Sequence, residues 1–252
     1  MAFPEKSDTE IKLLTKKSLH HFFDFMVETV KTFTISKKEI QKRFVYTNVE
    51  LLQELEKSGK SIILMGAHYG NWEWTIHLGQ LINYKPYAAY TKIRNSYFEK
   101  IIKSSRSKFG GRFIRTSDTI KTIAKNKQDN LLSLYALLGD QSPQLHKTHY
   151  WGHFFNMHVP VITGPEMLAK KYDFNVVYFD VSVVKRGYYE ATFKLITQTP
   201  LEYENYEITD IFLKMTEAHI RKNPEYYLWT HKRFKHKDKY EQWKENRKAS
   251  QI

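Results

Sequence analysis

The stretch SIILMGAHYGNWEW, residues 61–74, decides the predicted fold. Its apolar first part predicts a short buried strand over 61–65, which the small residues that follow bring to an end. Asn71 is a favoured helix N-cap and predicts a helix over 71–81. His68 therefore falls on the loop between strand and helix. In open α/β sheets, binding and catalytic sites form at this edge, outside the carboxyl ends of the strands.

The rest of the chain continues the alternation of strands and helices. Ser7 and Glu10 have the spacing of a capping box and open a long amphipathic N-terminal helix within residues 3–35. Further helices are predicted over 48–58, 96–108, 117–126, 165–172 and 207–222, with Ser117 as a possible cap. Strands are predicted over 86–91, 112–115, 131–138, 175–184 and 188–196, with a long connection over 139–160. This order predicts one α/β domain over residues 1–252, with a central, mainly parallel (mixed) sheet flanked by helices and a basic tail over 238–252.

The composition limits the possible partners. The 252-residue chain has no cysteine, so disulfides and thiolate metal sites are excluded. Its formal charge of +13 favours an anionic partner such as nucleic acid, an acidic carrier protein or a membrane surface. No apolar run approaches the roughly 18 residues of a membrane-spanning helix.

His68 and Glu73 form the candidate catalytic pair. Glu73 falls in the first turn of the predicted helix, where the helix dipole favours an ionised carboxylate. A carboxylate beside an imidazole fixes its tautomer and stabilises the imidazolium, so the pair can activate a hydroxyl without a Ser or Cys nucleophile. We expect Gly70 to leave room for a substrate, and His77 to be structural. Taken alone, this spacing also occurs by chance in many proteins.

Four motifs carry a family resemblance. GAHYGNWE is similar to the His-x4-Asp/Glu motif of the glycerolipid (lysophospholipid) acyltransferase superfamily, in the Glu form typical of the bacterial late acyltransferases of lipid A biosynthesis. Three more stretches match that family in order and spacing: YTKIRNSYFEKIIKSSRSKFG, LLSLYALLGDQSP and HIRKNPEYYLWTHKRFK. The resemblance covers residues 3–237. Thr91 stands where the family has an Arg.

The resemblance implies an O-acyltransferase with a glycerolipid acyltransferase-like fold. His68 would be the general base and Glu73 its partner. The family's functional Arg and Asp positions fall on Arg106 and Asp140. Asn95, Gln141 and Gly70 join these two as expected substrate-binding residues. A solvated helix face for Arg106 and a loop cap for Asp140 remain open. Amides near Gly70 or after Asp140 are the candidate oxyanion donors.

The same resemblance implies the partners. The acyl group would pass from a thioester, on acyl carrier protein, to a hydroxyl of a lipid A precursor or another anionic lipid, with no cofactor and no metal. In the lipid A case the acceptor is the 3-hydroxyl of an attached acyl chain. We expect the enzyme at the cytoplasmic face of the bacterial inner membrane, either peripheral or anchored by an N-terminal segment missing from this chain.

Three alternatives remain open. Aminoacyl lipids or glycolipids of the envelope are other possible acceptors. A basic nucleic-acid-binding protein would share the charge and the aromatic residues near Lys and Arg, although no nucleic-acid motif is present and we expect no nucleic acid as partner. A metal hydrolase is suggested by four histidines in one predicted loop: His146, His149, His153 and His158.

Overall fold

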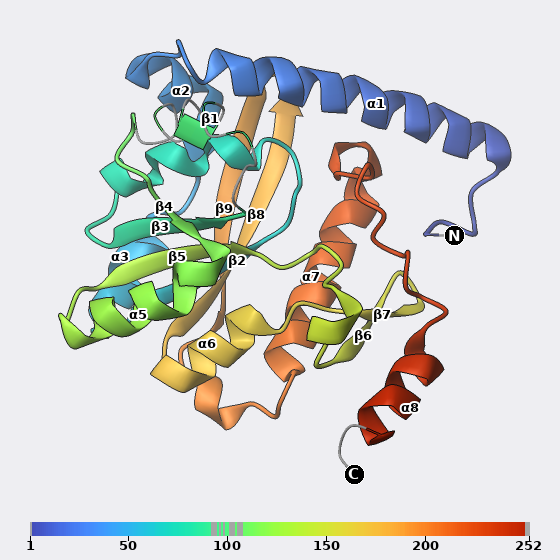
Figure 1. The fold of residues 1–252 in the computed structure, drawn as a ribbon. Coiled ribbons are helices and arrows are strands. Elements are labelled where there is room, and N and C mark those ends of the chain that lie inside the picture. The colour runs from blue at the N-terminus through green and yellow to red at the C-terminus, as the bar shows by residue number, and fades with distance from the viewer. Residues whose placement is uncertain are drawn as a thin grey trace.

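The computed structural model describes residues 2–91, 95, 97, 99–100, 104 and 108–249. Seven strands form one sheet in the order β1-β9-β8-β2-β5-β3-β4, in which β8, β2, β5, β3 and β4 run parallel (Figure 1). β9 runs antiparallel to β8, and β1 runs parallel to β9. The predicted single α/β domain with a mixed, mainly parallel sheet is confirmed.

The strands and helices lie close to the predicted ranges. The sheet strands are β1 (Phe44–Tyr46), β2 (Ile62–Gly66), β3 (Lys85–Tyr90), β4 (Arg112–Arg115), β5 (Ser133–Leu138), β8 (Asn175–Lys185) and β9 (Tyr188–Thr197). The α-helices of the described residues are α1 (Asp8–Lys31), α2 (Lys37–Arg43), α3 (Glu50–Glu56), α5 (Thr119–Gln128), α6 (Gly164–Tyr172), α7 (Glu207–Lys222) and α8 (Tyr240–Ala249). The helix predicted over 96–108 falls largely outside the described residues.

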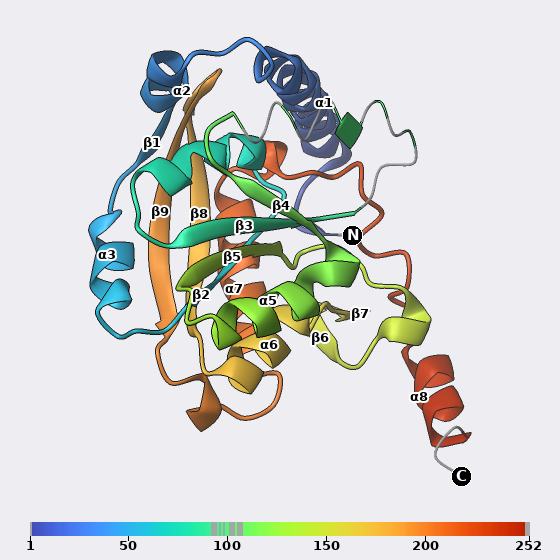
Figure 2. The same ribbon diagram turned by 60° about the vertical axis from the view of Figure 1, so that its left-hand side comes forward.

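β2 forms the centre of the core because both of its faces are covered. All five of its residues are buried. Ile63 and Met65 pack into the cluster that includes α6 and α7, while Ile62 and Leu64 pack into the cluster that includes α2 and α3. Helices therefore cover both faces of the sheet (Figure 2), as parallel sheets require.

The predicted helix after His68 is a 3₁₀-helix, η1 (Trp72–Gln80). The predicted cap is confirmed, because Asn71 Oδ1 accepts a hydrogen bond from the Trp74 amide at 3.2 Å. The predicted helix is therefore present, but in the tighter 3₁₀ form. The segment is rich in aromatic and β-branched residues, which are poor helix formers, and Gly79 is pressed against Pro86 so closely that a Cβ atom would lie 2.5 Å from its ring.

Other expectations were incomplete. Ser117 does not cap α5, since it lies in the 3₁₀-turn η2 (Thr116–Asp118) that precedes the helix. The connection over 139–160 contains a hairpin of β6 (Trp151–Phe154) and β7 (Met157–Pro160). α2, β1 and α8 were not predicted.

Among the described residues, no helix combines the length and the apolar character needed to cross a bilayer.

α1 begins with the predicted capping box and lies across one end of the sheet (Figure 1). Its one buried residue is Glu28, whose Oε2 accepts hydrogen bonds from Asn71 Nδ2 and from the Tyr189 hydroxyl, both at 2.7 Å. One turn later, Thr32 Oγ1 accepts from Trp74 Nε1 at 3.0 Å. These polar contacts tie the helix to the loop that carries His68.

The burial of Glu28 predicts a pH dependence of stability. Burial raises the pKa of Glu28 above 4.5, and the hydrogen bonds from Tyr189 and Asn71 only partly oppose this. Because the folded state then binds the proton more tightly than the unfolded chain, this residue's stabilising contribution is complete below the pKa of the unfolded chain and is lost as the pH rises through the higher folded value. Glu28→Gln keeps an oxygen for both donors and cannot ionise.

Denaturant unfolding at a series of pH values measures this effect. We expect the free energy of unfolding of Glu28→Gln, relative to that of the unsubstituted protein, to increase as the pH rises from about 4 to about 8. A difference between the two proteins that does not change with pH would contradict the assignment.

Candidate active site

The pairing register of β2 and β5 brings His68 and Asp140 together. Gly66 is the Cα partner of Leu138 in this parallel pair, and the Gly139 amide extends the ladder by donating to the Gly66 carbonyl at 3.1 Å. His68 and Asp140 each lie two residues beyond the paired strand ends. Two residues at equal offsets from a parallel pair emerge at the same edge of the sheet.

A short hydrogen bond joins the two side chains. His68 Nδ1 lies 2.7 Å from Asp140 Oδ1, and the aspartate side chain is only 1% exposed. Burial alone would raise the pKa of Asp140, but its interaction and hydrogen bonds with His68 outweigh burial and hold that pKa below its usual value. An ionised Asp140 accepts from Nδ1–H, which leaves the lone pair on Nε2. The side-chain amide of Gln141 lies 3.3 Å from Nε2.

This geometry gives Nδ1 of the imidazole a partner that the sequence analysis did not pair with it. An Nδ1 atom makes one hydrogen bond, and in the structure that bond is with Asp140, whereas the sequence assigned the orienting role to Glu73 and a substrate-binding role to Asp140. Glu73 lies on η1 and lines the same cavity as His68. What Glu73 does there stays a prediction.

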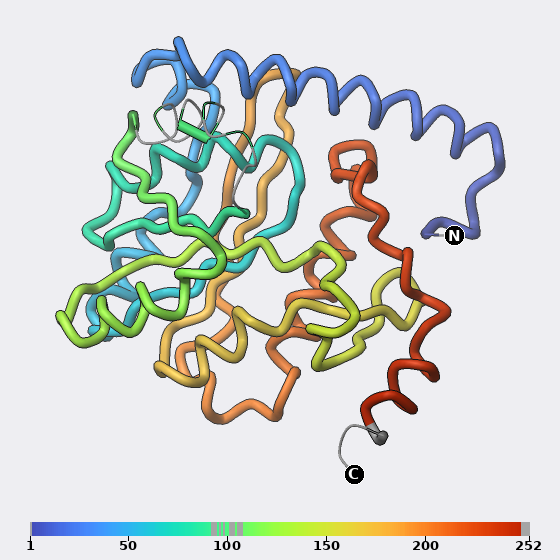
Figure 3. Tube along the Cα trace, viewed as in Figure 1, coloured from blue at the N-terminus to red at the C-terminus, as the bar shows by residue number. Residues whose placement is uncertain are grey.

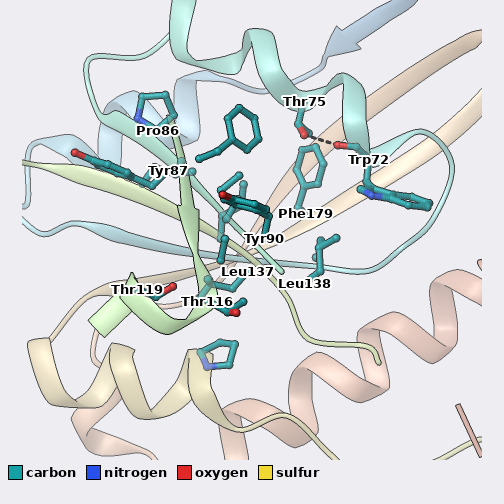
Figure 4. A pocket seen from close by; sticks show the side chains of 18 of the residues that line it. Trp72, Thr75, Pro86, Tyr87, Tyr90, Thr116, Thr119, Leu137, Leu138 and Phe179 are labelled. Carbon is teal, nitrogen blue, oxygen red and sulfur yellow. Dashed lines mark hydrogen bonds between the residues drawn. The ribbon is translucent and has the colours of Figure 1, made fainter. Parts of the chain in front are cut away.

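His68 faces a large apolar cavity of about 870 Å³, the first cavity. Its walls come from the carboxyl-terminal parts of β3 and β5, from η1 and from α6. Figure 4 shows Trp72, Tyr87, Leu137, Leu138 and Phe179 around this space. Two exposed cations, Arg112 and Lys171, also line it. The cavity is therefore large enough and apolar enough to hold an alkyl chain, and its two cations suit an anionic group at the rim.

The C-terminal motif holds the two loops of the site in place. The Leu228 amide donates to the His68 carbonyl, and the Gly70 amide donates to the Tyr226 carbonyl, both at 3.0 Å. The Ser142 amide donates to His231 Nε2 at 3.0 Å, which fixes the loop after Asp140. In the Cα trace of Figure 3, this red segment rises beneath α1 before it turns toward α8.

Two more residues of this motif shape the electrostatics of the site. Arg233 is buried and donates to the Pro160 carbonyl at 3.0 Å; burial lowers its pKa, while the negative charge of Asp140 acts in the opposite direction. Burial and the charge of Asp140 raise the pKa of Tyr227. In the sequence analysis this motif matched the family, but no functions were predicted for Tyr227, His231 and Arg233.

The remaining predicted residues lie elsewhere. Gly70 has a φ of +57° and packs against Val181 and Tyr189, so it does not line the first cavity, and its amide is not available as an oxyanion donor. Asn95 is exposed and its Oδ1 accepts from the Tyr97 amide at 3.0 Å, as in a helix cap. Arg106 lies outside the described residues.

The predicted structural role of His77 is confirmed. It is buried, and its Nδ1 lies 2.9 Å from the Trp74 carbonyl. Of the four loop histidines, His153 and His158 stack across the β6–β7 hairpin with ring centroids 5.0 Å apart. Within the described part of the chain, no three His, Asp or Glu side chains are grouped as metal ligands.

Comparison with known proteins agrees with the motif resemblance. Residues 1–236 match the family model described as bacterial lipid A biosynthesis acyltransferase. A stretch of 148 residues, 57% of this chain, is 24% identical to lipid A biosynthesis acyltransferase 2 of Shigella flexneri. The match spans 46% of that relative, so the chain aligns with about half of its length.

The conformation of Gly70 predicts a stability effect. Gly70→Ala places a Cβ atom 3.1 Å from Val181 Cγ1 at a positive φ, whereas Gly59→Ala has a similar φ of +67° with no atom within 4 Å. The left-handed backbone alone costs roughly 1–2 kcal/mol. We expect thermal unfolding to show a larger loss for Gly70→Ala than for Gly59→Ala. Equal losses would mean that the contact with Val181 relaxes freely.

Proposed function

Because the chain belongs to the bacterial lipid A biosynthesis acyltransferase family, we propose that it transfers a fatty acyl group from a thioester to a hydroxyl of a lipid. The observation that carries this proposal is the His68–Asp140 pair at the wall of the first cavity. The pair supplies a general base, and the cavity supplies an apolar space for the acyl chain.

The proposed reaction needs no covalent enzyme intermediate. Nε2 of His68 takes the proton of the acceptor hydroxyl as its oxygen attacks the thioester carbonyl carbon. Ionised Asp140 stabilises the imidazolium that forms. The tetrahedral intermediate then collapses: the carbon–sulfur bond breaks, the ester remains, and the imidazolium returns its proton to the departing thiolate.

Gln141 is the proposed donor to the thioester oxygen. Its side-chain amide already lies 3.3 Å from Nε2 of His68, and the residue lines the first cavity. The amides of Gly70 and Ser142, which belong to the two loops considered for this role, both donate elsewhere. An amide N–H at this position would stabilise the charge that develops on the carbonyl oxygen.

The charge of the protein supports an anionic donor and an anionic acceptor. We propose acyl carrier protein, which is acidic, as the donor and a phosphorylated lipid A precursor as the acceptor, with its 3-hydroxyacyl group receiving the chain. The net charge of +13 favours both partners, and the cations Arg112 and Lys171 at the first cavity favour the acidic donor. Mass spectrometry of lipids from a deletion strain distinguishes this acceptor from aminoacyl lipids and glycolipids.

α1 supports a place at the membrane surface. Four of its apolar residues form an exposed stripe at helical spacing: Phe23, Met26, Val27 and Val30. Large exposed apolar patches mark interaction surfaces. Lys16 and Lys17 on the same helix would gain roughly 1 kcal/mol each near anionic lipid. We propose that this outer stripe lies on the cytoplasmic face of the inner membrane.

Three substitutions test the catalytic roles. His68→Asn keeps a donor for buried Asp140 and removes Nε2, so transfer from acyl carrier protein should fall to background. Asp140→Asn should lower kcat by roughly 10²–10⁴-fold, because a neutral amide neither fixes the tautomer of His68 nor balances the positive charge of its imidazolium. Glu73→Gln should lower it much less. Thioester turnover with a lipid acceptor measures all three, with circular dichroism as the check on folding.

Two results would contradict these roles. Substantial transfer by His68→Asn would remove His68 from the mechanism. A larger loss in Glu73→Gln than in Asp140→Asn would return the orienting role to Glu73.

Membrane contact has its own test. Phe23 on α1 and Leu201 in the connection between β9 and α7 are 64% and 65% exposed, and their segments lie at opposite ends of the molecule (Figures 1 and 2). Phe23→Asp should weaken binding to vesicles of anionic phospholipid by about tenfold or more, because a phenyl ring no longer enters the bilayer. Leu201→Asp is the matched control. Equal binding of the two variants in a co-sedimentation assay would argue against contact through α1.

A further inference from the structure

A second cavity, of about 390 Å³, lies between α1 and residues 226–230. Its walls are mostly apolar and include Ile11, Leu14, Leu19 and Phe25 of α1 and Leu228 of the C-terminal motif. Neither the catalytic pair nor the first cavity accounts for this space.

Trp72 is the wall that the two cavities share. Its indole meets the His68 ring edge to face, with centroids 5.0 Å apart. The same indole stacks on Phe25, with centroids 4.3 Å apart and an interplanar angle of 24°. The backbone also joins the second cavity to the site, because the Leu228 amide donates to the His68 carbonyl. One aromatic ring therefore contacts the catalytic imidazole and lines the second cavity.

We propose that the second cavity binds the alkyl chain of the acceptor lipid, next to the hydroxyl that His68 deprotonates. This proposal rests on the acyl-transfer function proposed above. A reaction that joins two lipids at one imidazole must hold two apolar chains at once. An acceptor chain left in water beside the site would lose the burial free energy that positions its hydroxyl. Two apolar cavities that both border Trp72 can hold these two chains.

The surroundings of the cavities decide which chain each one holds. Leu19 lines the second cavity and is 48% exposed, so the cavity wall continues directly into the outer stripe of α1 that begins at Phe23. A lipid that resides in the membrane would enter from that side. The first cavity has Arg112 and Lys171 among its lining residues, which suits a donor delivered by an acidic carrier from the aqueous phase.

A chain-length series tests the assignment. The probes are N-(3-hydroxyacyl)glucosamine phosphates whose acyl chains are shortened by two methylene groups at a time, with acyl carrier protein thioester as donor. In the unsubstituted enzyme, KM for the probe should rise roughly fourfold for each methylene removed, the factor expected when each methylene is buried. Leu14→Trp fills the second cavity, so KM for the longest probe should rise and its dependence on chain length should disappear.

The adjacent leucine provides the matched control. Leu13 is 55% exposed and is not part of the cavity wall, so Leu13→Trp should keep the chain-length dependence of the unsubstituted enzyme. Ser18→Phe, which enters the same cavity one turn further along α1, gives a second blocking variant if Leu14→Trp unfolds at a lower temperature. Both blocking variants should give the same loss of chain-length dependence.

The outcomes separate this inference from the function on which it rests. An unchanged chain-length dependence in both blocking variants would overturn the acceptor site while leaving acyl transfer intact. A rise in KM for the thioester instead of the acceptor would also overturn it, because the second cavity would then hold the donor. An unsubstituted enzyme that moves no acyl group to any lipid would refute the proposed function itself.

Discussion

The site depends on one constraint, the parallel register of β2 and β5. This register pairs Gly66 with Leu138 and so places His68 and Asp140 side by side, two residues beyond the strands. A shift of one residue along either strand would turn its side chains to the opposite face of the sheet. The register is well specified, because β2 is buried on both faces between two helix layers. Packing far from the imidazole therefore sets the 2.7 Å contact with Asp140.

A buried carboxylate needs favourable charges or hydrogen bonds to stay ionised. Residues of the C-terminal motif supply part of this stabilisation around Asp140. Losing one partner of a buried ion pair costs roughly 3–5 kcal/mol, because the remaining charge has no water around it. Asp140 is paired with His68, and the buried guanidinium of Arg233 interacts favourably with its charge. His231 holds the following loop through the Ser142 amide. A segment about ninety residues away in sequence thus stabilises the ionised form of Asp140.

Local signals in the sequence were sufficient for most elements but not for the partner of His68. The capping box at Ser7, the strand over 112–115 and the helix over 207–222 follow from short-range patterns, and the structure confirms them. The β6–β7 hairpin has no glycine at its turn; Phe155 and Asn156 adopt positive φ values of 52° and 57° instead, so the usual turn signal is absent. Asp140 was recognised as a functional position, but its pairing with His68 depends on strand order, which periodicity does not reveal. The equal offsets of His68 and Asp140 from two apolar strands were the available signal.

α1 shows why the membrane surface and the catalytic loop are mechanically connected in the proposed function. Glu28 is the one buried residue of its 24, Ile11 and Leu14 pack partly buried against the core, and apolar residues lie on its outer side. Near the end of the helix two specific polar contacts are made: Glu28 binds Asn71, and Thr32 binds Trp74, residues that flank Trp72 in sequence. In the proposed function, these hydrogen bonds join the helix that would contact the bilayer to the loop that follows His68. A helix fixed to its domain mainly by packing could slide without moving single residues, whereas these hydrogen bonds fix the position of α1 relative to the cap of η1. If α1 lies on the membrane as proposed, it therefore also sets the distance between the membrane surface and the imidazole.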